Sequence, residues 1–121
     1  EHKVLPENYK ISAETAEILN KAKTENRRII AIGTTTTRAL ETAISKHEKF
    51  IAEKNLADLT ITPGFKFKAI DGILTNFHLP QSSLLVLTST FGGYELIMKS
   101  YKHAVAQKYR FYSYGDCMFV Y

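Results

Sequence analysis

The longest uncharged run of the chain, residues 72–94, most strongly limits what it can fold into. These 23 consecutive residues contain no Asp, Glu, Lys or Arg, and a helix of that length would cross a bilayer. Polar residues, Pro80 and a Gly pair interrupt the run, however, and its longest aliphatic stretch covers only residues 84–87. We therefore expect a buried segment of a globular protein, in which Asn76 and His78 must find partners or ligands.

The size and composition of the chain fit one domain or part of a larger one. Its 121 residues are 45% hydrophobic and include seven Tyr and seven Phe, which is enough apolar material for a substantial core. Cys117, the one cysteine, has no partner for an internal disulfide, so we expect a cytoplasmic protein and a small core residue at this position. The chain begins at Glu1 without an initiator Met or a leader, which favours a piece cut from a longer polypeptide.

The first half of the chain predicts a helix, a strand and a second helix. Ser12 is a suitable N-cap for a helix over residues 13–23, and the apolar run 27–33 is typical of a strand buried on both faces. Gly33 ends that strand. A second helix begins at once with Thr34, and its apolar residues recur at helical spacing, so strand, turn and helix form one α/β unit.

The second half predicts two short strands, two helices and a final strand. Alternating apolar residues over 59–61 and 65–67 indicate strands around a turn at Pro63. Ser82 or Ser83 is expected to cap a helix that ends at the Gly pair 92–93, a further helix covers residues 94–107, and 117–121 forms a strand or hairpin. The fold class is therefore α/β, with a mixed or largely parallel sheet flanked by helices.

Three motifs carry groups that could do chemistry. His78 could act as an acid or base with Asp71 nearby in sequence, although a structural histidine is the alternative. The second motif is a helix start whose N–H groups, hydroxyls and Arg38 suit a carboxylate or phosphate, unless the threonines only cap the helix; its threonines are Thr34, Thr35, Thr36 and Thr37. The third is a turn over residues 113–116 that displays Asp116, and a plain turn is its alternative.

The positive charge of the chain is concentrated late in the sequence. The net charge is +4, and no acid lies between Glu95 and Asp116. Aromatic residues are interleaved there with four cations, Lys99, Lys102, Lys108 and Arg110. Cations beside flat rings suit single-stranded RNA, whereas solvated lysines around core rings would explain the same pattern without a ligand. The remaining histidines, His2, His47 and His103, show no ligand spacing, so no metal site is proposed.

Three sequence blocks resemble a known enzyme family. They are RIIAIGTTTTRALE at 28–41, PGFKFKAIDGILTNFHLPQSSLLVLTSTFGG at 63–93 and YKHAVAQKYRFYSYGDCMFV at 101–120. In this order they are similar to the carboxyl-terminal portion of the S-adenosylmethionine:tRNA ribosyltransferase-isomerase family of queuosine biosynthesis. Members of that family are much longer. The resemblance therefore implies that residues 1–121 are the carboxyl-terminal part of an α/β domain, without its amino-terminal part and the β-barrel domain inserted in it.

The resemblance implies an activity and a set of partners. The family moves the ribosyl group of S-adenosylmethionine, a consumed donor, onto 7-aminomethyl-7-deazaguanine in tRNA, and the product is epoxyqueuosine-tRNA. No resident cofactor or metal is expected, and the full-length enzyme is expected to be a cytoplasmic monomer.

Laid over the motifs, this chemistry makes His78, Asp71 and Asp116 the acid/base candidates. Binding of the donor would fall to the four threonines, Arg38, Asn76 and Tyr114, and the four late cations would bind tRNA. A non-catalytic RNA-binding module and a nucleotide-binding or structural α/β piece are the alternatives.

Overall fold

The computed structural model describes residues 5–78, 82–112 and 115–121. In chain order the elements are β1 Glu7–Ile11, α1 Ala13–Thr24, β2 Ile30–Ile32, α2 Thr34–His47, β3 Glu53–Ala57, β4 Gly72–Asn76, α3 Ser83–Gly92, α4 Tyr94–Ala106 and β5 Cys117–Val120.

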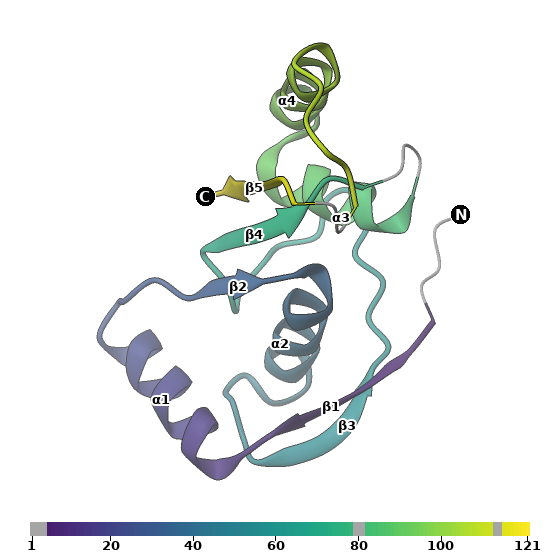
Figure 1. Ribbon diagram of the computed structural model, residues 1–121. Coiled ribbons are helices and arrows are strands. Elements are labelled where there is room, and N and C mark those ends of the chain that lie inside the picture. Colours follow the sequence, from purple (N-terminus) through teal and green to yellow (C-terminus); the bar gives the residue numbers. More distant parts are fainter. Residues whose placement is uncertain (1–4, 79–81, 113–114) are drawn as a thin grey trace.

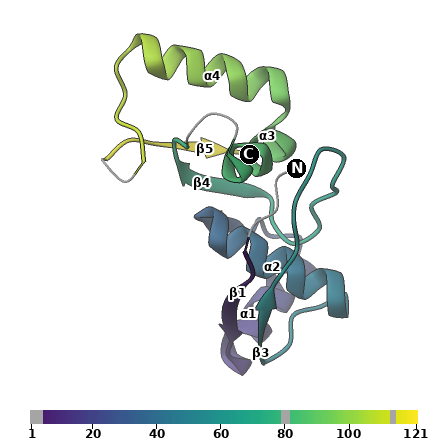
Figure 2. The same cartoon turned by 90° about the vertical axis from the view of Figure 1, so that its right-hand side faces the viewer.

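The strands form two separate sheets. In the three-stranded sheet, of order β2-β4-β5, β2 runs parallel to β4 and β5 runs antiparallel to it. The second sheet is an antiparallel ribbon of β1 and β3. Mixed α/β architecture is therefore confirmed. In both views α4 lies beyond edge strand β5, whereas α2 and the ribbon lie towards the other edge strand, β2 (Figure 1, Figure 2).

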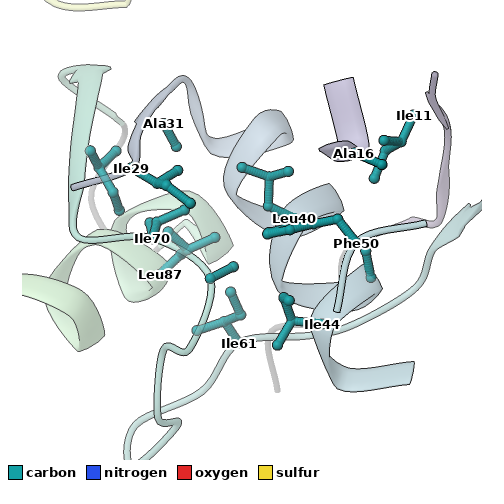
Figure 3. Close-up of a cluster of buried hydrophobic side chains, with 13 residues drawn as sticks. Ile11, Ala16, Ile29, Ala31, Leu40, Ile44, Phe50, Ile61, Ile70 and Leu87 are labelled. Carbon is teal, nitrogen blue, oxygen red and sulfur yellow. The ribbon is translucent and has the colours of Figure 1, made fainter. Parts of the chain in front are cut away.

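Helix α2 is the centre of the main hydrophobic core. Its residues Leu40, Ala43 and Ile44 are buried, as their spacing predicts, and they share one cluster with Ala31 and Ile73 from the sheet. Figure 3 shows this cluster continuing into α1, α3 and the loops that flank β3. A second, smaller cluster joins α4 to the end of the sheet through Phe77, Leu85, Ile97, Tyr101, Ala104 and Val120.

The opposite face of the three-stranded sheet is open. Because side chains alternate along a strand, Ile30, Ile32, Leu74 and Tyr121 share the face that Ala31 and Ile73 avoid. Ile30 is 38%, Ile32 70% and Tyr121 81% exposed, so the described part of the chain leaves this face uncovered. The prediction that the first apolar strand is buried on both faces is therefore wrong.

Helix boundaries agree with the sequence signals better than strand boundaries do. Ser12 and Ser82 accept hydrogen bonds from Thr15 N and Leu85 N at 3.1 Å, so both capping predictions are confirmed. Residues 58–62 and 65–68 contain no strand, which corrects the prediction of two strands around the turn at Pro63.

Cys117 is exposed and not a core residue, because it lies on the outer face of edge strand β5.

A buried arginine joins α2 to the β1–β3 ribbon. Arg38 is 1% exposed, and each of its three side-chain nitrogens donates a hydrogen bond. Nε binds Leu59 O at 3.1 Å and Nη2 binds Ala57 O at 2.9 Å. Nη1 binds Leu5 O at 3.3 Å and Glu7 Oε1 at 3.2 Å. Arg38 therefore has a carboxylate partner inside the chain, Glu7, and its contacts tie α2 to the ribbon; a role of Arg38 in substrate binding stays a prediction.

A buried glutamate one turn later holds the loop that leads into β4. Glu41 is 1% exposed, and its two oxygens accept hydrogen bonds from the backbone N–H groups of Lys68, Ala69 and Ile70 at 2.9–3.1 Å. Burial raises the pKa of its carboxyl group, while these N–H donors oppose that rise. Arg38 and Glu41 together fix α2 between the β1–β3 ribbon and the loop that leads into β4.

We predict that Arg38→Met lowers the free energy of unfolding by about 3 kcal/mol or more, because three backbone carbonyls lose their donor in or near the core. Urea denaturation followed by circular dichroism measures the change. The matched control is Arg28→Met, since Arg28 is exposed, and its effect should stay within about 0.5 kcal/mol. Equal effects of the two variants would contradict the assigned role of Arg38.

Candidate functional site

The parallel pairing of β2 and β4 brings several sequence motifs to one edge of the sheet. Both strands end at the same edge, where Gly33 N donates to Leu74 O at 2.8 Å. Strand β5 begins there, because Cys117 lies opposite Asn76. We call this the carboxyl edge; it comprises the start of α2, residues 76–78 and residues 115–117. In open α/β sheets, ligands bind outside the carboxyl ends of parallel strands.

His78 lies at the carboxyl edge in a half-buried site. Its Nε2 is 2.9 Å from Thr75 Oγ1, and its backbone N–H donates to the Tyr101 hydroxyl oxygen at 2.8 Å. Burial lowers the pKa of the imidazole below its ordinary value of 6.5, so His78 is neutral at physiological pH. A neutral imidazole can accept a proton, and Thr75 and Tyr101 hold this one in place.

Asn76 is exposed on the outer face of β4, beside a rigid aromatic group. The next residue, Phe77, is buried and stacks on Phe111 with ring centroids 5.1 Å apart. Phe77 O also accepts a hydrogen bond from Tyr112 N at 2.9 Å. The stacking of Phe77 and its hydrogen bond with Tyr112 therefore fix the backbone next to Asn76, and the amide of Asn76 is exposed at the carboxyl edge.

Asp116 also reaches the carboxyl edge, but it already has a partner. Its Oδ2 accepts hydrogen bonds from Arg110 N at 2.5 Å and Arg110 Nε at 3.3 Å. The backbone N–H of Arg110, followed by its guanidinium, lowers the pKa of this carboxyl group. Asp116 is therefore a carboxylate at neutral pH, and its geometry fits an anchor for Arg110 better than a proton donor.

The four threonines at the start of α2 divide into two kinds. Thr34 and Thr37 are buried, and Thr37 Oγ1 donates to Gly33 O at 3.0 Å. Thr35 and Thr36 are exposed, and Thr35 Oγ1 donates to Glu7 Oε1 at 3.4 Å. Only the exposed pair therefore presents hydroxyls at the carboxyl edge.

Two further predicted site residues lie elsewhere or outside the described residues. Asp71 precedes β4 and lies at the opposite edge, where its Oδ2 accepts from Ile29 N at 2.8 Å and its own N–H donates to Ile29 O at 2.7 Å. This geometry does not support Asp71 as the partner of His78, because the full length of β4 separates them. Tyr114 lies outside the described residues.

The late basic stretch has both buried and exposed rings. Tyr101 is buried against Phe77, whereas Tyr109 and Tyr112 are 43% and 44% exposed. Lys99, Lys102, Lys108 and Arg110 are all exposed. Some rings of this stretch therefore belong to the core, as a purely structural explanation requires. Others are exposed in the same stretch as the four cations, as RNA binding would require.

A polar network far from the carboxyl edge was missed by the sequence reasoning. Glu53 Oε2 accepts from the Tyr9 hydroxyl at 2.6 Å, and Glu53 Oε1 lies 3.0 Å from His47 Nε2. The three residues come from β3, β1 and α2, so their contact could not be predicted from sequence spacing.

Among the described residues, no group of three or more His, Cys, Asp or Glu side chains is arranged to hold a metal ion. No described helix is both long and apolar enough to cross a membrane.

Comparison with known proteins identifies the family. Residues 1–120 match the family described as queuosine biosynthesis protein. The chain belongs to the queuosine biosynthesis protein family. It is 50% identical over 120 residues to the S-adenosylmethionine:tRNA ribosyltransferase-isomerase of Syntrophotalea carbinolica, and 50% identical over 121 residues to that of Fusobacterium nucleatum. This family member spans 35% and 34% of the lengths of those two relatives.

A solved structure of the same family has the same fold. The chain is 41% identical in sequence to the S-adenosylmethionine tRNA ribosyltransferase of Thermotoga maritima, and it superposes on the crystal structure of that protein with a TM-score of 0.84. The similarity covers 94% of this chain and 40% of that chain.

We predict that the imidazole of His78 titrates below pH 6.5, because burial disfavours its charged form. NMR titration of the imidazole resonances, assigned with a His78→Gln variant, measures this pKa. Since the unfolded chain binds the proton more readily, this residue also makes the fold less stable as the pH falls from about 7 towards the lowered pKa. A His78 resonance that titrates at or above pH 6.5 would contradict the buried, neutral assignment.

Proposed function

We propose that this chain is the carboxyl-terminal part of the α/β domain of an S-adenosylmethionine:tRNA ribosyltransferase-isomerase. In this proposal the whole enzyme transfers and isomerises the ribosyl group of S-adenosylmethionine onto 7-aminomethyl-7-deazaguanine in tRNA and forms epoxyqueuosine-tRNA. The observation that carries it is the 50% identity to relatives of that name over 99% and 100% of this chain. The carboxyl edge, where the three matching sequence blocks meet, supports it.

The open face of the three-stranded sheet supports the division into domains. Ile30, Ile32 and Tyr121 form an apolar surface that a complete α/β domain would cover, because such sheets normally carry helices on both faces. The relatives are almost three times as long as the part of them that this chain spans. We infer that the rest of the α/β domain packs on this face, and that the inserted β-barrel domain lies outside the 121 residues.

The proposed reaction needs groups that the carboxyl edge presents. Loss of a proton beside the sulfonium requires a base, departure of adenine is easier when its ring is protonated, and the attacking amine must be neutral. His78 is the acid/base group that the geometry favours, since its imidazole is neutral and contacts Thr75, while its backbone N–H donates to the Tyr101 hydroxyl. Asn76, Thr35 and Thr36 would bind polar edges of the donor.

In this proposal S-adenosylmethionine is a substrate that is consumed, and the enzyme has no resident cofactor or metal. Lys99, Lys102, Lys108 and the guanidinium of Arg110 would contact the phosphates of tRNA. The enzyme would act in the cytoplasm as a monomer.

A non-catalytic RNA-binding module is the second candidate. It is favoured by one observation: two ionisable residues of the predicted catalytic set, Asp71 and Asp116, are occupied by contacts within the chain. In that case the basic surface of α4 would bind tRNA, while His78 would be a structural histidine.

We predict that His78→Gln in the full-length enzyme lowers single-turnover adenine release by about 10²- to 10⁴-fold, the usual contribution of an acid/base group. Quantifying free adenine after mixing enzyme, donor and tRNA measures it. The control is Asp71→Asn, at the opposite edge of the sheet, which should keep the activity per folded molecule. Full activity of a folded His78→Gln enzyme would favour the non-catalytic candidate.

We predict that tRNA affinity falls steeply with salt and that Lys99→Gln and Lys102→Gln each reduce the slope of log K against log salt by about 0.7–0.9. Filter binding at several salt concentrations measures the slope. Lys21→Gln is the matched control, because Lys21 is exposed on α1, which lies far from α4 in Figure 1. An unchanged slope in the α4 variants would assign those lysines to solvent alone.

A further inference from the structure

A groove runs between α4 and edge strand β5. Its volume is about 430 Å³, within the range of about 300–1,000 Å³ that small organic ligands fill. It adjoins the carboxyl edge, because Cys117 is the β5 residue opposite Asn76. The lining residues are Phe77, Lys99, Ser100, His103, Tyr109, Cys117, Met118 and Phe119.

The two walls of the groove differ in chemistry. Helix α4 contributes Lys99 and His103, which are four residues apart and therefore lie on one face of the helix. Strand β5 contributes Cys117, at the carboxyl edge, and the neighbouring Met118. The groove therefore has a cation and an imidazole on its α4 wall and less polar side chains on its β5 wall.

Tyr109 lines the groove with a ring that packs against two other rings. Its ring meets Phe77 edge to face, with centroids 5.9 Å apart, and His103 in the same manner at 6.0 Å. The ring is nevertheless 43% exposed, so part of it is open to a ligand. A ring fixed in this way offers a stacking surface at low entropic cost.

The charge around the groove favours an anion. None of the groove-lining residues is acidic, and Lys102 and Lys108 lie on neighbouring exposed positions. The closest acid along the chain beyond Tyr109, Asp116, is occupied by Arg110. Positive charge beside exposed rings is the combination with which proteins bind unstacked nucleotides.

We propose that this groove holds one unstacked nucleotide of the tRNA loop, adjacent to the base that is modified. The base stacks on Tyr109, and the phosphate lies near Lys99 and His103. This inference rests on the proposed function, because the modified base must then lie at the carboxyl edge while its neighbour enters the groove. It assigns a ligand to His103 and Tyr109, which the proposed reaction does not use.

The first experiment uses the exposed Cys117 as a reporter in the full-length enzyme with its other cysteines replaced. A benzophenone attached to Cys117 is irradiated with an anticodon stem-loop that carries 7-aminomethyl-7-deazaguanine, and the crosslinked nucleotide is mapped. We expect crosslinks to the nucleotides that flank the modified base. The same label on a Lys21→Cys, Cys117→Ala enzyme is the control and should give no crosslink.

The second experiment measures affinity for the same stem-loop. Tyr109→Ala should weaken binding by about 10- to 100-fold, as expected for loss of one base-stacking ring, and Tyr109→Phe should bind as the wild type does. Thermal unfolding checks that both variants keep their fold. Because Tyr109→Phe preserves the ring, its normal affinity separates stacking from a hydrogen-bonding role of the hydroxyl.

The outcomes distinguish a failure of the nucleotide-binding groove from a failure of the proposed function. If the wild-type enzyme binds and modifies the stem-loop, but Tyr109→Ala binds normally and Cys117 crosslinks only to the enzyme's own chain, the groove is an internal contact and the inference is overturned. The proposed function then stands. If the wild-type enzyme neither binds the stem-loop nor releases adenine with it, the proposed function fails, and the inference fails with it.

Discussion

The parallel pairing of β2 with β4 is the constraint on which the arrangement depends. Three residue pairs, from Ile30 and Gly72 to Ile32 and Leu74, set the register, and the contact between Gly33 N and Leu74 O extends it into the turn. Parallel strands leave their carboxyl ends at one edge, so segments far apart in the sequence meet there. Without this pairing, the start of α2 and residues 76–78 would have no reason to lie together.

The buried charges hold the framework of the chain together. Arg38 is a site candidate in the sequence and Glu41 is not, yet both are buried in the structure, which is rare for charged side chains. In the structure they replace missing backbone partners: Arg38 donates to carbonyls beside β3, and Glu41 accepts from N–H groups of a loop without regular structure. Of the described residues, the half-buried His78 and the exposed Asn76, Thr35 and Thr36 are the predicted site residues whose polar groups lie at the carboxyl edge.

The helices could be predicted from the sequence because their signals are local. Ser12 and Ser82 cap helices, and Leu40, Ala43 and Ile44 recur at the helical period. The β1–β3 ribbon could not, because its residues, ENYKI and EKNLA, pair across more than forty positions and carry little apolar alternation. The alternation of apolar residues over 59–67 was misleading, because those side chains pack against the main hydrophobic core without forming a strand of either sheet.

The same contrast explains the candidate site. His78 and Asn76 could be identified because polar residues stand out in an uncharged run, but the partners of His78 come from different elements. Thr75 precedes it by three residues, whereas Tyr101 reaches it from α4. The position of Asp71 could not be judged from its proximity in sequence, because a strand of five residues separates the two edges of the sheet.

The pair of clamps on α2 has a mechanical consequence. Arg38 ties the helix to the ribbon, and Glu41 ties the same helix, one turn later, to the loop that enters β4. A hinge between the ribbon and the sheet would have to break one of these two sets of buried contacts, on one side of α2 or the other, which makes bending there costly. Any adjustment that accompanies ligand entry should therefore occur in the helical pair α3–α4, while the half of the molecule around α2 behaves as a stiff base.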